Sequence, residues 1–262
     1  MKNIFKKIGV ASLTLITIMG VVGCTKPAQN EKVVSEKEIV IGFDNTYVPM
    51  GYMDENGDTV GFDIDLATET FKRLDMKFKF QSIDWAMKEA ELNSGNIDAI
   101  WNGYTLTEER MKKVSYTDSY LQNKQLIITL KDSDIKTKED IKGKILGTQQ
   151  GSAALEAIEK DTNLVKSLDN GQPILYDTFD NVFRDLEAKR VDVVVADETL
   201  ARYYISKKGE EKYSVLEENF GKEDYVVAFR KGDTELRDKV NNTIKEIKED
   251  KTFDKIYTTW FK

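Results

Sequence analysis

The sequence predicts an α/β fold in which strands and helices alternate along the chain. Apolar or alternating runs of strand type recur at 38–43, 77–82, 97–100, 125–130, 145–148, 193–196 and 225–229, and helical patterns follow several of them. The 262 residues suffice for one large or two modest domains. A hydrophobic content of 40% and a charged content of 32% are typical of an ordinary soluble globular protein.

Residues 1–23 have the pattern of a signal peptide. Lys2, Lys6 and Lys7 precede an apolar stretch from Ile8 to Val22, which is too short and wrongly flanked for a membrane-spanning helix. The stretch ends in Val21-Val22-Gly23-Cys24, which resembles the lipobox of bacterial lipoproteins, where the cysteine receives a diacylglyceryl group and becomes the new N-terminus. The alternative is an incidental free cysteine. Because Cys24 is the only cysteine and occupies this position, we expect lipidation, with acyl chains (palmitate among them) that anchor the protein to the cell membrane. The polar segment 24–37 is expected to be a flexible tether.

Composition excludes several classes of site. The chain has no histidine and one cysteine, so internal disulfides, Cys- or His-based metal sites and histidine-dependent catalytic triads are excluded. Loss of the three leader lysines changes the formal charge from -7 to -10. An acidic exported protein is a poor binder of nucleic acid or of anionic lipid headgroups.

The first part of the mature chain alternates between strands, turns and helices. The strand at 38–43 leads into the polar and aromatic loop Asp44–Met50, and Asp54–Asp58 is expected to be a hairpin tip. The spacing of a calcium-binding EF-hand loop is absent from this turn. A helix is predicted from Gly61 to about Leu74, a strand at 77–82 and a helix at 85–93.

The stretch from Asn96 to Arg110 is the strongest candidate for a binding site. Its strand at 97–100 is predicted to stop at Asn102-Gly103, followed by small polar residues and by Thr107 as the N-cap of a helix. Small ligands lie outside the carboxyl ends of strands in open α/β sheets. Arg110 would stand in the first helical turn, where the helix dipole disfavours a cation, so an anionic ligand is expected beside it. The alternative is a solvated surface arginine.

A second strand-end site is predicted further along. The strand at 145–148 runs into the small-residue turn Gln149–Ala154 and a helix at 154–160, which together offer backbone N–H groups to an anion, although the P-loop pattern is absent. The strand at 193–196 ends in Asp197-Glu198. Leu186 precedes Val191-Asp192 by the interval that separates Leu92 from Ile97-Asp98, which indicates two lobes of similar plan. Asp98 and Asp192 stand at strand entrances and are expected to be structural. Closing helices are predicted at 237–247 and 252–261.

These motifs together resemble one family, the periplasmic-type solute-binding proteins of polar amino-acid ABC transporters (family 3 extracellular solute-binding proteins). The resemblance covers about 38–262 and rests on DNTYVP, GDTVGFDIDLA, IDAIWNGYTLTEER, QGSA and VVADE, in that order and at family-like spacing. It implies a two-lobed, type II periplasmic-binding-protein-like α/β fold with the ligand cleft between the lobes. The lobes would comprise 38–122 together with the return 224–262, and 123–223.

The resemblance also implies roles for individual residues. Arg110 would grip the ligand α-carboxylate, and Thr105 and the Ser152 turn would add donors to the same group. Asp197, from the other lobe, would bind the α-ammonium, to which Asn102 or Gly103 would offer a carbonyl. The side-chain pocket would be lined by Tyr47 and Trp85, with Asp44 reading the distal polar group. A planar cation facing a carboxylate across a cleft suits a zwitterion and lets the ligand hold the cleft closed.

The expected function is therefore that of a lipoprotein receptor, a monomer without a cofactor or catalytic residue, that delivers a polar L-amino acid to an ABC permease. Glutamine, a basic amino acid and cystine stay open as ligands, because Asn102, Gly103 and Ala153 replace residues common in the family. Two alternatives share the fold. One is an enzyme of the cyclohexadienyl dehydratase type, in which Asp44 or Glu198 would serve as acid or base. The other is a sensor ectodomain, which we expect to carry a transmembrane or signalling segment that this sequence does not show.

Overall fold

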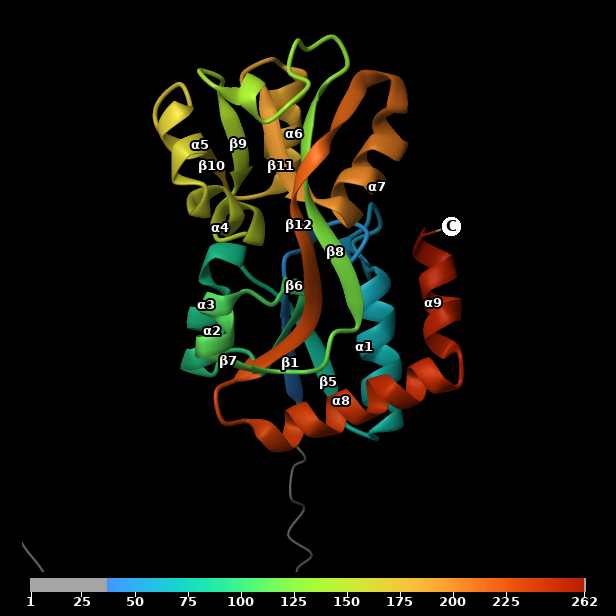
Figure 1. The fold of residues 1–262 in the computed structure, drawn as a ribbon. Coiled ribbons are helices and arrows are strands. Elements are labelled where there is room, and N and C mark those ends of the chain that lie inside the picture. Colours follow the sequence, from blue (N-terminus) through green and yellow to red (C-terminus); the bar gives the residue numbers. More distant parts are fainter. Residues whose placement is uncertain (1–36, 262) are drawn as a thin grey trace, which may run out of the picture. The chain divides into compact units, whose positions relative to one another are not determined.

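The computed structural model describes residues 37–261 (Figure 1). The predicted signal peptide 1–23, the predicted lipidation site Cys24 and all of the predicted tether 24–37 except Lys37 lie outside the described residues. Between residues 37 and 261, none of the helices has the length and apolar character needed to cross a membrane.

Nine strands form one mixed sheet in the order β10-β9-β11-β8-β12-β6-β1-β5, with β7 paired to β12 beside this path. Parallel pairs join β1 to β5 and β6, and β9 to β10 and β11. This confirms the predicted α/β class. The strand bounds are β1 Ile39–Phe43, β5 Phe78–Ser82, β6 Ala99–Thr105, β7 Val114–Tyr116, β8 Leu121–Leu130, β9 Leu146–Gln149, β10 Ile174–Tyr176, β11 Val193–Asp197 and β12 Tyr213–Arg230.

Figure 1 shows two groups of elements that β8 and β12 connect. We call the group of β1–β7, α1–α3, α8 and α9 the first lobe, and the group of β9–β11 and α4–α7 the second lobe. β12 pairs with β8 from Tyr213 to Tyr225 and then with β6 and β7 as far as Arg230. The strand predicted at 225–229 is therefore only the last part of an 18-residue strand. The middle of β12 is polar and does not show a strand pattern in the sequence. The register with β8 also shifts there, between Val215 and Lys222.

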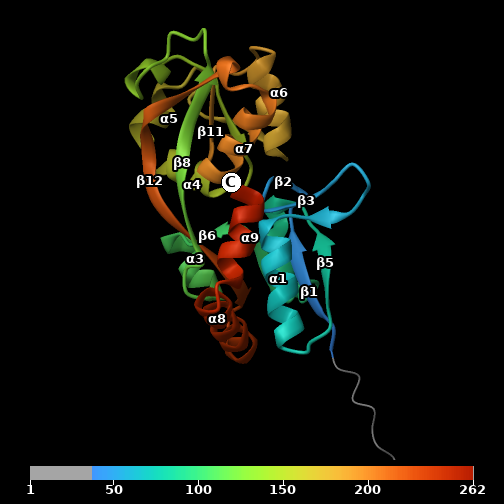
Figure 2. The ribbon, with the colours of Figure 1, turned by 90° about the vertical axis from the view of Figure 1, so that its right-hand side faces the viewer.

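The helices cover both lobes. Their bounds are α1 Phe62–Arg73, α2 Lys88–Ser94, α3 Glu108–Lys113, α4 Ala153–Lys160, α5 Thr162–Ser167, α6 Phe179–Glu187, α7 Glu198–Lys208, α8 Thr234–Glu249 and α9 Thr252–Phe261, with 3₁₀ turns η1 Trp85–Met87, η2 Glu139–Ile141 and η3 Glu210–Lys212. The predicted helix at 85–93 is thus a 3₁₀ turn followed by α2. Figure 2 shows α9 beside α1, where Phe253 and Phe261 of α9 pack on the ring of Phe62.

A small antiparallel sheet carries one side of the candidate site. It comprises β2 (Thr46–Tyr47), β3 (Gly51–Met53) and β4 (Thr59–Val60). The predicted tip at 54–58 joins β3 to β4, because the Asp54 carboxylate accepts bonds from the Asn56 and Asp58 N–H groups, both at 2.9 Å. This hairpin prediction is confirmed.

The two lobes repeat one structural contact. In the first lobe the Asp98 carboxylate accepts the Val40 N–H at 3.0 Å, and in the second lobe the Asp192 carboxylate accepts the Ile145 N–H at 2.8 Å. Each aspartate therefore ties the entrance of one strand to its parallel neighbour. The structural roles expected for both residues are confirmed.

The strand that carries the polar candidates is longer than predicted. β6 does not stop at Asn102-Gly103 but continues to Thr105, and all seven of its residues are buried. The reason is a long-range partner, since β12 pairs with Tyr104 and Thr105 through Val226 and Tyr225. Gly103 has a φ of +59° within this run, and a Cβ there would lie 2.8 Å from the Tyr47 ring. The polar side chains thus stand on a rigid strand instead of a loop.

Candidate functional site

A small cavity lies where the two lobes face each other. Seven of the nine predicted ligand-binding residues line it: Tyr47, Trp85, Gly103, Thr105, Arg110, Ser152 and Asp197. Gln149, Ala153 and Phe179 complete the lining. Asp44 and Asn102 are not part of it, but Asp44 bonds to Gln149 of the lining and Asn102 bonds to Asp44. The space open to the centre of a water molecule is about 10 Å³, which is enough for about one water. An amino acid can therefore enter only when the lobes move apart.

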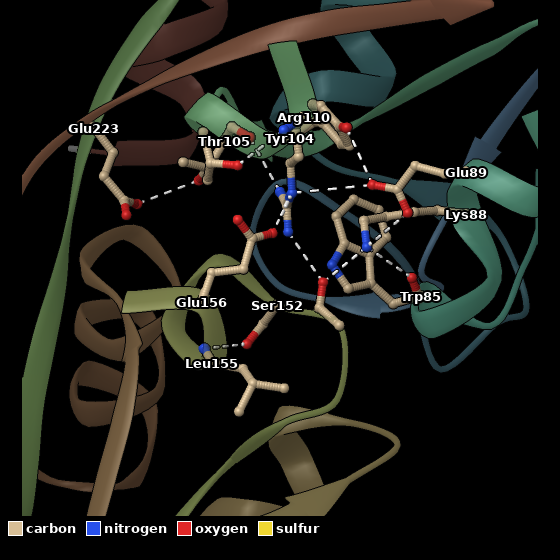
Figure 3. Close-up of polar contacts among 12 residues, drawn as sticks. Trp85, Lys88, Glu89, Tyr104, Thr105, Arg110, Ser152, Leu155, Glu156 and Glu223 are labelled. Carbon is tan, nitrogen blue, oxygen red and sulfur yellow. Dashed lines mark hydrogen bonds and ion pairs between the residues drawn. The ribbon is translucent and has the colours of Figure 1, made fainter. Parts of the chain in front are cut away.

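Arg110 is the central cation of this cavity (Figure 3). Thr107 caps α3 by accepting the Arg110 N–H at 3.2 Å, as predicted, and this turn directs the arginine side chain inward, where it is 1% exposed. The guanidinium donates from Nη1 to the Thr105 carbonyl (3.1 Å), from Nη2 to the Gly151 carbonyl (3.0 Å) and from Nε to Glu156 (2.8 Å). These bonds use three of its five N–H groups, so one hydrogen on each terminal nitrogen is available for a bidentate carboxylate contact. The solvated-surface alternative for Arg110 is wrong.

A second buried cation stands beside Arg110. Lys88 is 2% exposed, donates to the carbonyl oxygens of Gly151 (2.7 Å) and Trp85 (3.2 Å), and lies 3.3 Å from Glu89. Burial, followed by the charge of Arg110, lowers the pKa of Lys88 to about 8. Figure 3 shows Glu89 and Glu156 near the two cations, so carboxylates of the protein balance this end of the cavity.

Gly151 joins the two lobes through its carbonyl oxygen. Its carbonyl accepts from Arg110 and Lys88 of the first lobe, and it has a φ of +68°. A Cβ at this position would lie 3.0 Å from the Ala86 backbone. The next residue, Ser152, caps α4 by accepting the Leu155 N–H at 3.0 Å, so its hydroxyl oxygen already has one partner.

Asp197 is the carboxylate that the second lobe contributes to the cavity. It ends β11 of the second lobe and is 4% exposed. Its Oδ1 accepts from Asn123 (2.6 Å), Gln125 (2.9 Å) and the Tyr225 hydroxyl (2.8 Å). Burial raises the pKa of Asp197 above its ordinary value, although these bonds oppose the rise. All three donors reach the same oxygen, which leaves Oδ2 as the side available to a ligand cation.

Three aromatic rings line the cavity together with Arg110 and Asp197. Tyr47 and Trp85 lie nearly parallel, with an interplanar angle of 6° and centroids 6.5 Å apart, and Phe179 packs at 6.3 Å from Tyr47. The Tyr47 hydroxyl lies 3.0 Å from that of Tyr225, which itself donates to Asp197. Hydrogen bonds through the Tyr225 hydroxyl therefore connect Tyr47 to Asp197.

Asp44 and Asn102 bond to backbone and side-chain groups next to the cavity. Asp44 accepts the Thr46 N–H at 2.9 Å, so it caps the following turn, and it also accepts from Gln149 of the second lobe at 2.7 Å. Burial raises the pKa of Asp44. The Asn102 side chain accepts the Asp44 N–H at 3.0 Å and donates to the Gly51 carbonyl at 3.3 Å. Its amide is thus engaged in positioning the β1 end.

Sequence reasoning missed several residues around the cavity. Gln149 stands at the end of β9 inside the motif already noted, so the strand-end rule could have found it. No local signal marks the others, because they reach the site through long-range pairing of strands or packing of helices: Lys88, Glu89, Asn123, Gln125, Glu156, Phe179 and Glu223.

The family is decided by a match over residues 39–262 to the model of the bacterial extracellular solute-binding proteins, family 3. The chain belongs to this family. The resemblance inferred from the motifs is thereby confirmed, as is the two-lobed type II fold.

Individual relatives agree with that assignment. The chain is 31% identical to the lysine/arginine/ornithine-binding periplasmic protein of Escherichia coli strain K12, over 95% of this chain and 96% of that one. It is 30% identical to the L-cystine-binding protein TcyA of Bacillus subtilis strain 168, over 85% and 81%. A crystal structure of an ABC uptake transporter substrate-binding protein from Streptococcus pneumoniae with bound histidine is 40% identical, with a TM-score of 0.84, over 87% and 93%. The two curated relatives are named for different amino acids, and the crystal structure holds a third, histidine.

Proposed function

We propose that this family 3 protein binds a polar L-amino acid between its lobes and delivers it to an ABC permease. The observation that supports the proposal most directly is that Arg110 and Asp197 line one small cavity from opposite lobes. A zwitterion carries the two complementary charges, and charge-assisted bonds to both ends give affinity and orientation together.

Each end of the ligand has a proposed partner. The α-carboxylate would take the two remaining N–H groups of Arg110, with the backbone of the Ser152 turn as a further donor. The Thr105 hydroxyl would add another donor by turning from Glu223 to the ligand. The α-ammonium would bind Asp197, with a carbonyl of Asn102 or Gly103 as second acceptor. The ligand side chain would lie against Tyr47 and Trp85, pointing toward Asp44 and Gln149.

The lobes meet in direct bonds that must open before a ligand can enter. Arg110 and Lys88 donate to Gly151, and Gln149 donates to Asp44. A ligand that bonds to Arg110 and Asp197 together favours the closed arrangement by differential binding. We propose the lobe boundaries as 38–122 with 224–262, and 123–223.

Glutamine, a basic amino acid and cystine are the proposed ligand classes. Asp44 suits a cationic or amide group at the far end of the side chain, and relatives are named for cystine and for lysine, arginine and ornithine. We further propose a monomer anchored outside the cytoplasm by acyl groups on Cys24. Mass spectrometry of the protein from membranes would test the anchor, and an unmodified Cys24 would contradict it.

The enzyme alternative has less support. An enzyme would need an acid or base facing the ligand. Of the two carboxylates considered, Asp44 is engaged with Thr46 and Gln149, and Glu198 pairs with Arg202 at 2.6 Å outside the cavity lining. Incubation with the bound amino acid, followed by chromatography, would separate the alternatives, because a receptor returns its ligand unchanged.

The test of the proposed function is a thermal-shift screen of the mature chain against all common amino acids and cystine. The protein is first unfolded and refolded, because ligand retained from cells would mask the response. A ligand at about a hundred times its Kd stabilises by about 2.7 kcal/mol, which shifts the unfolding midpoint by several degrees. No shift with any amino acid would overturn the proposal.

A further inference from the structure

Glu223 forms a second carboxylate position next to Asp197. It stands on β12, on the strand that connects the lobes, and its Oε2 accepts from Gln125 (2.8 Å), Thr105 (3.3 Å) and Asn123 (3.5 Å). The Gln125 amide nitrogen also donates to Asp197 at 2.9 Å, and the Asn123 nitrogen does so at 2.6 Å. Two amide groups therefore hold the two carboxylates together.

Gln125 and Asn123 are buried residues of the central sheet. They are 0% and 3% exposed, and both stand on β8, between β11 and β12. Each amide nitrogen faces two acidic oxygens, an arrangement that requires pairing among β8, β11 and β12. Thr105 links the same Glu223 oxygen to β6 of the first lobe. The pair thus lies where both lobes and both connecting strands converge.

Nearby cations do not neutralise this pair. Arg110 acts on Asp197 through space, but its Nε is bonded to Glu156 of α4 at 2.8 Å. On β8, Lys124 lies 3.8 Å from Glu198 of α7. On β12 the neighbouring charged residues Lys222 and Asp224 are exposed, and Asp224 accepts from Ser119. The Tyr225 hydroxyl donates a hydrogen bond to Asp197. Two like charges on shared donors, with Asp197 buried and Glu223 partly buried, favour retention of a proton.

The pKa shifts of the two carboxylates agree with this geometry. Burial, and next the charge of Asp197, raise the pKa of Glu223 to about 7, and burial raises the pKa of Asp197. At neutral pH and below, the pair therefore carries a proton for part of the time.

We propose that Asp197 and Glu223 act as one carboxylate pair that exchanges a bound proton for the α-ammonium of the ligand, which makes Glu223 a specificity-determining residue. The inference rests on the proposed function, since it deepens the description of the ammonium end. When the ammonium bonds to Asp197, its charge favours ionisation of Glu223, and the proton of the pair leaves to solvent. A ligand without a full positive charge at this end does not trigger the exchange and leaves the pair protonated.

The consequence is a linkage between affinity and pH. Glu223 does not line the cavity, so it acts on the ammonium through Asp197. Below the pKa of the pair, the neighbour of Asp197 is an uncharged carboxyl group, and above that pKa it is a second carboxylate. Affinity therefore rises with pH, by up to tenfold for each unit by which binding lowers the pKa of Glu223. Replacement of Glu223 by glutamine keeps the shape of the side chain and removes the second charge.

The test is titration calorimetry of the mature chain with L-glutamine, L-arginine, L-lysine and L-cystine, between pH 5.5 and pH 8. Each titration is run in two buffers of different ionisation enthalpy, so that proton release is measured directly.

The wild type is expected to bind about tenfold more tightly at pH 8 than at pH 5.5 and to release part of a proton near pH 7. Glu223→Gln is expected to match the wild type at pH 5.5, to fall behind it at pH 8 and to release no proton. Asp224→Asn is the matched control, since it removes one charge from the adjacent, exposed position and should keep the wild-type slope.

Three results would overturn the inference. In the first, Glu223→Gln keeps the wild-type slope and proton release. In the second, Asp224→Asn loses the slope as well, which would make the effect one of net charge. In the third, a folded Glu223→Gln variant binds no amino acid at pH 5.5. Failure of the proposed function looks different, because the wild-type protein then binds none of the amino acids at any pH and shows no thermal shift in the wider screen.

Discussion

The Nε of Arg110 lies 2.8 Å from Oε1 of Glu156, across the boundary between the lobes. The two residues are 46 positions apart, and only the folded arrangement of α3 against α4 brings them together. Glu156 is partly exposed, whereas Arg110 is buried. Glu156 therefore occupies the Nε side of the guanidinium, next to the terminal nitrogens that we propose for the ligand carboxylate.

From this contact we predict that Glu156→Gln binds the ligand more tightly than the wild type. The substitution removes a negative charge that repels the incoming carboxylate and offsets part of the positive charge of Arg110. Discounted for solvent screening, the gain should be about 1 kcal/mol, or roughly fivefold in Kd. Calorimetry measures it, and Glu159→Gln, on the exposed face of the same helix, is the control. An unchanged or weakened affinity would contradict the competition.

Removal of the guanidinium should abolish measurable binding. Arg110→Ala leaves a desolvated ligand carboxylate without its partner, which typically costs about 2–5 kcal/mol, a loss of roughly thirty- to several-thousand-fold. Arg110→Lys should also bind poorly, because an ammonium keeps the charge but not the two parallel N–H bonds. Circular dichroism verifies the fold, and Arg184→Ala on the exposed part of α6 serves as control. Normal binding by Arg110→Ala would remove this residue from the site.

Asp197→Asn should separate binding from stability. Its affinity for an amino acid should fall by an amount comparable to that of Arg110→Ala, because the ammonium loses its anionic partner. The fold should keep its thermal stability or gain some, since burial raises the pKa of Asp197 and the charged form is therefore costly in the folded state. Thermal unfolding without added amino acid, together with calorimetry, tests both parts. A destabilised variant with intact affinity would reverse the assignment.

Features that depend on neighbouring residues were predictable from sequence. Thr107 caps α3 and the 54–58 turn closes a hairpin because each bonds to groups a few positions away. Seven predicted residues line one cavity. Arg110, Ser152 and Asp197 stood at strand ends or helix starts, where ligands bind in such sheets, whereas the ligand roles of Tyr47 and Trp85 came from the resemblance to the family.

Features that depend on distant partners were not predictable. The extension of β6 to Thr105 requires pairing with β12, 120 positions away at Tyr225, and the extension of β12 back to Tyr213 requires pairing with β8, 83 positions away at Leu130. For the same reason the Asp197–Glu223 pair was hidden, since Gln125 joins them from a third strand. Hydrophobic periodicity carries no information about such partners.

Asp63 supplies a prediction about pH and stability. It follows the first residue of α1 and is 0% exposed, and its Oδ2 accepts the Gly103 N–H at 2.7 Å and the Tyr120 hydroxyl at 2.9 Å. It therefore holds the β6 segment that carries the candidate site. Burial raises the pKa of Asp63 to about 7 from 3.8, while the two hydrogen bonds oppose the rise.

The sign of the effect follows from proton binding. Because the folded state holds the Asp63 proton more tightly than the unfolded state, its contribution to stability is fully present below pH 4 and is lost as the pH rises toward 7. The change is on the order of 4 kcal/mol. Asp63→Asn retains an acceptor for Gly103 and Tyr120 but does not titrate, so the variant should become more stable relative to the wild type as the pH rises. Urea unfolding of both proteins at pH 4, 5.5, 7 and 8 measures that difference. A constant difference across this range would show that Asp63 is already ionised in the folded protein at pH 4, and a decreasing one would reverse the sign of its coupling to folding.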